Sequence, residues 1–146
     1  MFIFISCKGA EKATVDNNLE EVEYLIKYEK TPCFGDCPVF SLLVDSNGDI
    51  FYHAKRNLDK TGEFTASLTF EELELLKELI KNSEFEEMAK RYPKDREIPA
   101  DLPASAITFF TEKEEKRILN YGYGAPSGLL RLEEFLERIR VSKSWK

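Results

Sequence analysis

The sequence predicts an α+β fold, in which helices cover one face of an antiparallel, hairpin-rich sheet. Apolar and polar residues alternate at the period of strands in the first half of the chain. The period then changes to that of helices, and the strand period returns before a terminal helix. The expected order is four strands, two helices, two strands and a helix (β-β-β-β-α-α-β-β-α), which is typical of an antiparallel sheet with helices grouped on one side.

The first four strands are expected between residues 21 and 68. Residues 21–30 alternate as a half-buried strand does, and the shared apolar face comprises Val22, Tyr24, Ile26 and Tyr28. Asn47-Gly48 readily adopts the positive φ angles of a type I′ turn, so the strands on either side of it should form a hairpin. The remaining strands are expected at 38–45, 49–55 and 63–68.

A capping box opens the first expected helix, over residues 69–81. Thr69 is the predicted N-cap, and Glu72 is placed to bond back to it. Ser83 to Glu86 repeats the pattern and predicts a short second helix that carries Phe85 and Met88. The apolar stripe of the first helix comprises Phe70, Leu73, Leu75, Leu76, Leu79 and Ile80.

The last third of the chain begins with a proline-rich loop. Tyr92 to Pro103 holds three prolines, which are unsuited to a helix interior or a central strand. A second hairpin is expected from residues 105–111 and 116–121, and the Tyr121–Gly128 segment then turns into the terminal helix. The apolar face of that helix comprises Leu129, Leu130, Leu132, Phe135, Leu136 and Ile139.

Composition and charge exclude several classes of protein. The 146 residues suit a single domain, and 42% of them are hydrophobic, which is enough for a core. Disordered chains, collagen-like chains and disulfide-packed miniproteins are excluded. The net charge of −6 argues against a nucleic-acid partner, because the phosphate backbone rewards a basic face. The longest apolar run is far short of the ~20 residues of a membrane-spanning helix.

The N-terminus resembles the end of a bacterial lipoprotein signal peptide, in which a cysteine receives the lipid. Apolar residues and Ser6 precede Cys7, and a polar stretch follows to residue 20. The basic segment and the full apolar segment of such a signal are missing. We therefore interpret residues 1–20 as the remnant of a signal plus a tether, with Cys7 lipidated, before a domain of residues 21–146. The alternative is an apolar N-terminus that packs on the domain.

Cys33 and Cys37 lie four positions apart in a segment bracketed by prolines, which suits a tight closed loop. We expect a structural disulfide between them, worth roughly 2 kcal/mol for so short a loop. A redox-active pair is more often Cys-x-x-Cys at the start of a helix, whereas a strand follows here. A zinc site needs two further ligands, and the chain offers only His53 and Cys7. We therefore expect no metal site.

This cysteine segment resembles an uncharacterised bacterial family of small domains, often secreted or lipoprotein-like, with a Pro-Cys-Phe-Gly-x-Cys-Pro motif. Pro32 to Pro38 matches that motif, and the resemblance covers about residues 24 to 140. It implies a shared extracytoplasmic fold and no activity, because the family has none assigned. Other similar features are the helix and turn from Phe70 to Phe85, Tyr92, Asp101-Leu102-Pro103 and Ala125-Pro126.

No catalytic residue is identified, and no cofactor is expected. His53 is the only histidine, and its strand position suggests a partly exposed side chain. Neither a dinucleotide-binding nor a Walker A pattern occurs. Asp101 is expected to accept backbone N–H bonds, and Ser127 to cap the terminal helix. The residues that could lie near a ligand are His53, Asp101, Tyr121, Tyr123 and Ser127.

The C-terminal segment, Arg138 to Lys146, is basic and contains a tryptophan. Basic residues at a helix C-terminus complement the helix dipole, which is the interpretation we favour. The alternative is contact with anionic lipid, which would suit a tethered protein.

The function expected from the sequence is a non-enzymatic binding or structural role outside the cytoplasm. The protein would be membrane-anchored through Cys7 or periplasmic, and its partner would be an unidentified protein or small ligand of the cell envelope. One alternative is an envelope enzyme or inhibitor with a site near the Asp101 loop and the Tyr121–Gly128 turn. A second alternative is a cytosolic domain whose cysteines are reduced.

Overall fold

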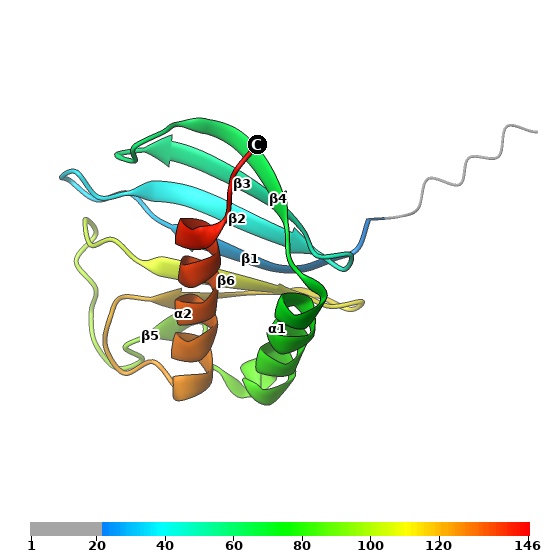
Figure 1. Ribbon diagram of the computed structural model, residues 1–146. Coiled ribbons are helices and arrows are strands. Elements are labelled where there is room, and N and C mark those ends of the chain that lie inside the picture. The colour runs from blue at the N-terminus through cyan, green and yellow to red at the C-terminus, as the bar shows by residue number, and fades with distance from the viewer. Residues whose placement is uncertain (1–21) are drawn as a thin grey trace, which may run out of the picture.

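The computed structural model describes residues 22–146 as one α+β domain, so the predictions for residues 1–20, including lipidation of Cys7, lie outside the described residues. A seven-stranded sheet carries two α-helices and a short 3-10 helix on one face (Figure 1). The elements are β1 (Tyr24–Lys30), β2 (Val39–Asp45), β3 (Asp49–Arg56), β4 (Gly62–Ser67), α1 (Phe70–Asn82), η1 (Phe85–Glu87), β5 (Arg91–Tyr92), β6 (Ser105–Phe110), β7 (Glu115–Asn120) and α2 (Ser127–Ser142).

The strand order is β4-β3-β2-β1-β6-β7-β5, so the first strand lies at the centre of the sheet. Both expected hairpins are present, β2–β3 and β6–β7. The expected antiparallel sheet is confirmed for β1 to β4, β6 and β7, and the additional two-residue strand β5 pairs parallel to β7 at one edge. The first residues of the proline-rich loop supply this strand, because Tyr92 pairs with Asn120 before the chain turns away.

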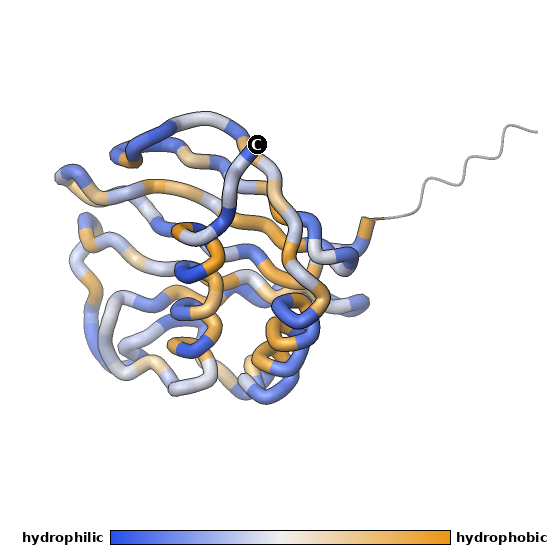
Figure 2. The backbone as a smooth tube through the Cα atoms, viewed as in Figure 1, coloured by the Kyte–Doolittle hydropathy of each residue, from blue (hydrophilic) through white to orange (hydrophobic). Residues whose placement is uncertain are grey.

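The two α-helices lie on the same face of the sheet (Figure 1), and hydrophobic and hydrophilic residues alternate along both (Figure 2). Within residues 22–146, no helix is both long and apolar enough to cross a bilayer. Phe70 departs from the expected stripe of α1 and is exposed. The fully buried large side chains of the core are Tyr28, Phe40, Phe109, Ile26, Leu42, Ile50, Leu76, Ile107, Ile118, Leu129, Leu132 and Leu136.

A bulge early in β1 corrects the expected apolar face of that strand. The register with β2 shifts between Tyr24 and Ile26, so one extra residue rotates the start of the strand. Ile26 and Tyr28 are buried as expected, whereas Tyr24 is exposed and packs against Phe110, with ring centroids 5.9 Å apart. Apolar and polar residues still alternate in the sequence through this point, but the Tyr24 side chain does not share the buried face of Ile26 and Tyr28.

The β2–β3 turn differs from the expected type I′. Only Gly48 takes a positive φ, of 87°, whereas type I′ requires one at both central residues. Gly48 N–H donates to the carbonyl of Asp45, and the Asp45 carboxylate accepts from the N–H groups of Asn47 and Asp49, both at 2.9 Å. The turn is therefore type I, followed by a glycine in the left-handed region. The Asp45 carboxylate stabilises the turn, and Gly48 completes it.

The capping box of α1 is confirmed, and the second one is wrong. Thr69 Oγ1 accepts from Glu72 N–H, and Glu72 Oε2 accepts from Thr69 N–H. Ser83 is instead the C-cap of α1, and its hydroxyl donates to the carbonyl of Ile80 at 2.7 Å. After Glu84, which has φ 55°, the chain makes only the three-residue η1.

The C-terminal segment folds back on the domain. Trp145 packs on Tyr52 with ring centroids 4.8 Å apart, and its indole donates to the carbonyl of Arg140. Lys146 exchanges two backbone hydrogen bonds with Thr65, so the tail pairs with the outer edge of β4. Lys143 forms an ion pair with Glu72 of α1. This segment therefore closes an exposed sheet edge.

Helices α1 and α2 meet closely at Gly128. A Cβ at this position would lie 2.9 Å from both the Cα and the carbonyl oxygen of Ser83. The expected cap by Ser127 is wrong, since Pro126 is the N-cap and makes no side-chain bond. The glycine is needed here because the opposing atoms are backbone, which cannot move aside as a flexible side chain can.

Replacing Gly128 by alanine should therefore destabilise the protein, although alanine has the higher helix propensity. Overpacking against backbone costs about 1–3 kcal/mol, against about 1 kcal/mol gained in propensity. We expect a lower urea midpoint for Gly128→Ala and an unchanged one for the exposed neighbour Ser127→Ala. An unchanged or higher midpoint for Gly128→Ala would contradict the close approach.

Candidate functional site

Three polar residues form one row across the inner face of the sheet. Lys30 of β1 pairs with Ser105 of β6, and Ser105 pairs with Asn120 of β7. Each follows the alternation of its strand, so its side chain points to the same side as buried apolar neighbours. The Lys30 ammonium donates a hydrogen bond to the Ser105 hydroxyl, although the two residues lie 75 positions apart in the sequence. The register of three strands thus assembles a polar corner in an otherwise apolar face.

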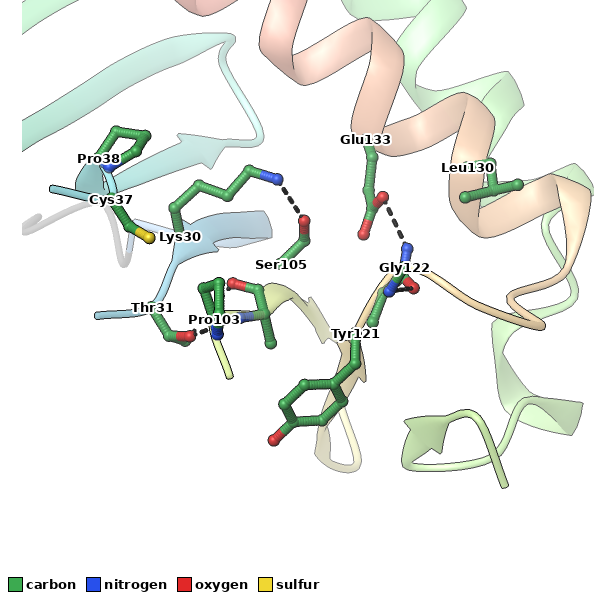
Figure 3. Close-up of a pocket in the computed structure, with 12 residues that line it drawn as sticks. Lys30, Thr31, Cys37, Pro38, Pro103, Ser105, Tyr121, Gly122, Leu130 and Glu133 are labelled. Atoms are coloured by element: carbon green, nitrogen blue, oxygen red, sulfur yellow. Dashed lines mark hydrogen bonds between the residues drawn. The ribbon is translucent and has the colours of Figure 1, made fainter. Parts of the chain in front are cut away.

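Glu133 of α2 points into this corner from above (Figure 3). Its Oε2 accepts a hydrogen bond from the Asn120 amide at 3.0 Å, and Asn120 also accepts from Gly122 N–H. The other oxygen, Oε1, is buried and has no hydrogen-bond partner. Lys30 is too far from Glu133 for an ion pair, so two opposite charges face the same space without direct contact.

The polar corner forms the inner wall of a pocket of about 480 Å³, within the usual size range of small-molecule sites. Figure 3 shows Lys30, Ser105 and Glu133 reaching toward it from β1, β6 and α2. The pocket therefore joins three strands (β1, β6 and β7), helix α2 and three loops that are distant in sequence. Its lining residues are Lys30, Thr31, Cys37, Pro38, Pro103, Ala104, Ser105, Asn120, Tyr121, Gly122, Leu130 and Glu133.

Burial raises the pKa of Glu133 above its ordinary value. The hydrogen bond from Asn120, the charge of Lys30 and the hydroxyl of Ser105 act in the opposite direction, but burial outweighs them. Burial also raises the pKa of Tyr28, helped by the negative charges of Glu137 and Glu133. The corner thus holds a carboxylate whose charge is poorly compensated.

Cys33 and Cys37 are joined by a disulfide, with Cα atoms 5.8 Å apart, as the spacing predicted. Gly35 N–H donates to Cys33 Sγ, and Asn57 donates its side-chain amide to the carbonyl of Cys37 at 2.9 Å. Because Cys37 lines the pocket, the disulfide loop forms part of its wall. The motif that the sequence singled out is therefore structural and also borders the site.

Four exposed apolar side chains lie in or next to the segments that line the pocket. One of them lines it directly, and the others lie within three positions in sequence of a lining residue. The most exposed, at the tip of the disulfide loop, is 92% accessible. These residues are Phe34, Leu102, Tyr123 and Leu130.

Only one of the residues expected near a ligand lines this pocket, namely Tyr121. Tyr123 is exposed and stacks against the Arg96 guanidinium, 4.8 Å from its ring centroid. Ser127 is exposed at the start of α2. His53 lies on the sheet face without helices, paired with Ser41 and Glu63, and is remote from the row at Lys30.

Asp101 is exposed, and none of the side-chain hydrogen bonds found within residues 22–146 involves it. The expected acceptance of backbone N–H bonds is therefore wrong, because Leu102 N–H donates to the carbonyl of Pro99 instead. The residues that follow Asp101 do reach the site, since Pro103 and Ala104 line the pocket. Within residues 22–146, no three histidine, cysteine, aspartate or glutamate side chains gather as a metal site requires.

Sequence reasoning missed Lys30, Ser105, Asn120 and Glu133, although a signal for them exists. Each is a polar residue at a position where the apolar period of its strand or helix predicts a buried side chain. Glu133, for example, lies between Leu129 and Leu136 on the apolar side of its helix, and both leucines are buried. Polar residues at core positions need partners and often belong to sites.

Comparison with known families adds one finding. A family model described as "Domain of unknown function (DUF6438)" matches residues 24–140. The match agrees with the span expected from the resemblance and with a family that has no assigned activity. It carries no statement about the cysteine motif or a bacterial origin, which stay predictions. No curated protein matches the chain.

The raised pKa of Glu133 predicts a pH-dependent stability. A carboxyl group with a raised folded pKa binds its proton more tightly in the folded state, so its contribution is full at low pH and is lost as the pH rises through that pKa. Glu133→Gln removes the charge that burial disfavours, so it should stabilise the protein near pH 8 by about 1 kcal/mol, the order of the cost of an unsatisfied buried polar group. The gain should shrink toward about pH 4.

Thermal unfolding across this pH range measures the effect. Glu134→Gln is the matched control, because Glu134 is the exposed neighbour on the same helix turn. Its unfolding temperature should follow that of the unchanged protein at every pH. A gain for Glu133→Gln that grows as the pH falls would contradict the raised pKa.

Proposed function

Because the chain belongs to this family of unknown function, we propose a function from the site itself: a non-enzymatic domain that binds a small ligand outside the cytoplasm. In this proposal Cys7 carries a lipid that anchors the domain, and the pocket beneath α2 holds the ligand. One observation carries the proposal. Glu133, whose Oε1 is buried without a hydrogen-bond partner, and Lys30 line the same open pocket.

The composition of the pocket supports binding. Ligand sites are concave and mainly apolar, with a few converging polar groups that orient the ligand. Here prolines, Leu130 and Tyr121 form the walls, and Lys30, Ser105 and Glu133 supply the polar groups. A buried acceptor without a partner costs about 1–3 kcal/mol. A ligand donor would remove that cost, so the free site is prepared for one.

The disulfide supports the proposed compartment. Structural disulfides form and persist in oxidising environments and are rare in the cytosol. The Cys33–Cys37 loop is short, and Cys33 and Cys37 are only partly exposed. With two of three cysteines paired, the remaining one is Cys7, at the position expected of a lipid acceptor.

An enzyme is the second candidate, and one observation favours it. The Lys30 ammonium bonds to the Ser105 hydroxyl inside the pocket, near Tyr121 and the end of the Asp101 loop. Serine nucleophiles activated by lysine occur in hydrolases. Lysine would have to accept the serine proton, yet here it donates its own. The nearby N–H groups of Ala104 and Gly122 already bond to Thr31 and Asn120, so they do not form an oxyanion hole.

The anchor is tested on protein expressed from the gene with its own upstream region. We expect the membrane fraction to hold a chain that begins at Cys7 with a lipid mass added, and Cys7→Ser to remove the lipid. Thiol titration of the unreduced, denatured protein should then find no free thiol. A soluble, unmodified chain with three free thiols would favour the cytosolic alternative instead.

Binding is tested with two-dimensional amide NMR spectra and a panel of amino acids, short peptides, monosaccharides and dicarboxylates. At least one probe should shift the amide signals of Ser105, Asn120 and Gly122, and leave that of His53, on the opposite face, unchanged. If no probe moves the pocket signals, the binding role is wrong. Labelling by a fluorophosphonate that Ser105→Ala abolishes would favour the enzyme.

A further inference from the structure

We propose that the pocket accepts a zwitterionic α-amino acid with an apolar side chain. The ligand carboxylate would bind the Lys30 ammonium, and the ligand ammonium would bind Glu133 Oε1. This inference rests on the proposed function and names the ligand class of the same pocket. Three features carry it, namely the unused bonding capacity of the two charges, their opposite signs and the apolar walls around them.

Each charged group has unused hydrogen-bonding capacity. An ammonium has three donors, and Lys30 uses one of them on Ser105. Glu133 uses Oε2 on Asn120 and leaves Oε1 buried without a donor. Both existing partners hold the charged groups at fixed places, so a ligand meets oriented side chains. Such preorganisation lowers the entropy lost on binding.

The opposite signs of the two charges select a ligand with both charges. A simple cation would satisfy Glu133 but would be repelled by the nearby Lys30, whose charge acts on Glu133. A simple anion would meet the reverse problem at the carboxylate. A zwitterion pairs with both and leaves the filled pocket neutral. Hydrogen bonds between ionised partners are shorter and stronger than those between neutral groups.

The walls favour an apolar side chain on that ligand. Pro38, Pro103, Tyr121 and Leu130 line the pocket beside the polar corner. The volume of about 480 Å³ exceeds what two small polar groups would fill. Leucine is therefore a suitable first probe.

The experiment compares L-leucine with two analogues that each lack one charge. N-acetyl-L-leucine has no ammonium, and L-leucine amide has no carboxylate. Affinities for the whole 146-residue protein are measured by calorimetry, and the amide signals of Ser105, Asn120 and Gly122 locate the site. Leucine should bind about 10- to 100-fold more tightly than either analogue, as expected for the loss of one charged hydrogen bond.

Two variants then each remove one of the two charges of the pocket. Lys30→Met should weaken leucine about 10- to 100-fold and leave the affinity for leucine amide nearly unchanged. Glu133→Gln should weaken leucine by a similar factor and leave that for N-acetyl-L-leucine nearly unchanged. The matched controls are Lys55→Met and Glu134→Gln, which alter exposed residues outside the pocket. Amide spectra establish that each variant is folded.

The inference is overturned if either analogue binds as tightly as leucine, or if none of the three moves the pocket signals. Both results come from the unchanged protein, so a variant that fails to fold does not affect them. A monosaccharide or dicarboxylate that shifts the pocket signals while leucine does not would overturn the amino-acid ligand and leave the proposed binding role standing. If no probe shifts the pocket signals, both the amino-acid ligand and the proposed binding role are overturned.

Discussion

Exclusion of water from one face of the sheet, beneath α1 and α2, is the constraint on which the rest of the structure depends. Every second residue of the central strands must be apolar or must find a partner there. Ile26 and Tyr28 satisfy this constraint in β1, as do Ile107 and Phe109 in β6. The close approach of the helices at Gly128 and the closure of β4 by the C-terminal tail keep that face covered.

The same constraint creates the site where apolar residues on the inner face of the sheet give way to the polar row of Lys30, Ser105 and Asn120. At Lys30, Ser105 and Asn120 the inner face stays partly enclosed, so their bonds form in a poorly solvated space. Glu133 is placed over this row by the helix that buries Leu132 and Leu136. Its unpartnered oxygen is a local loss of stability that a purely structural position would have no reason to keep.

The disulfide loop has a second consequence for the site. It links the end of β1, which carries Lys30, to the start of β2, so its closure limits how far Thr31 and Cys37 can move apart. Cys37 lines the pocket, whereas the tip of the loop presents Phe34 to solvent.

Much of the fold could be predicted from the sequence, because periodicity, capping and turn chemistry are local. The six strands of six to eight residues, the α1 capping box, both hairpins and the Cys33–Cys37 bond all follow from residues near one another. Three features could not be predicted: the facing of Tyr24, the parallel pairing of β5 and the exposure of Asp101. They result from a bulge, an edge pairing and a loop path, which depend on distant segments. The site belongs to this second group. Its polar residues were visible as exceptions to the apolar period, but Lys30 and Ser105 meet across 75 positions, and only the strand register decides which exceptions become neighbours.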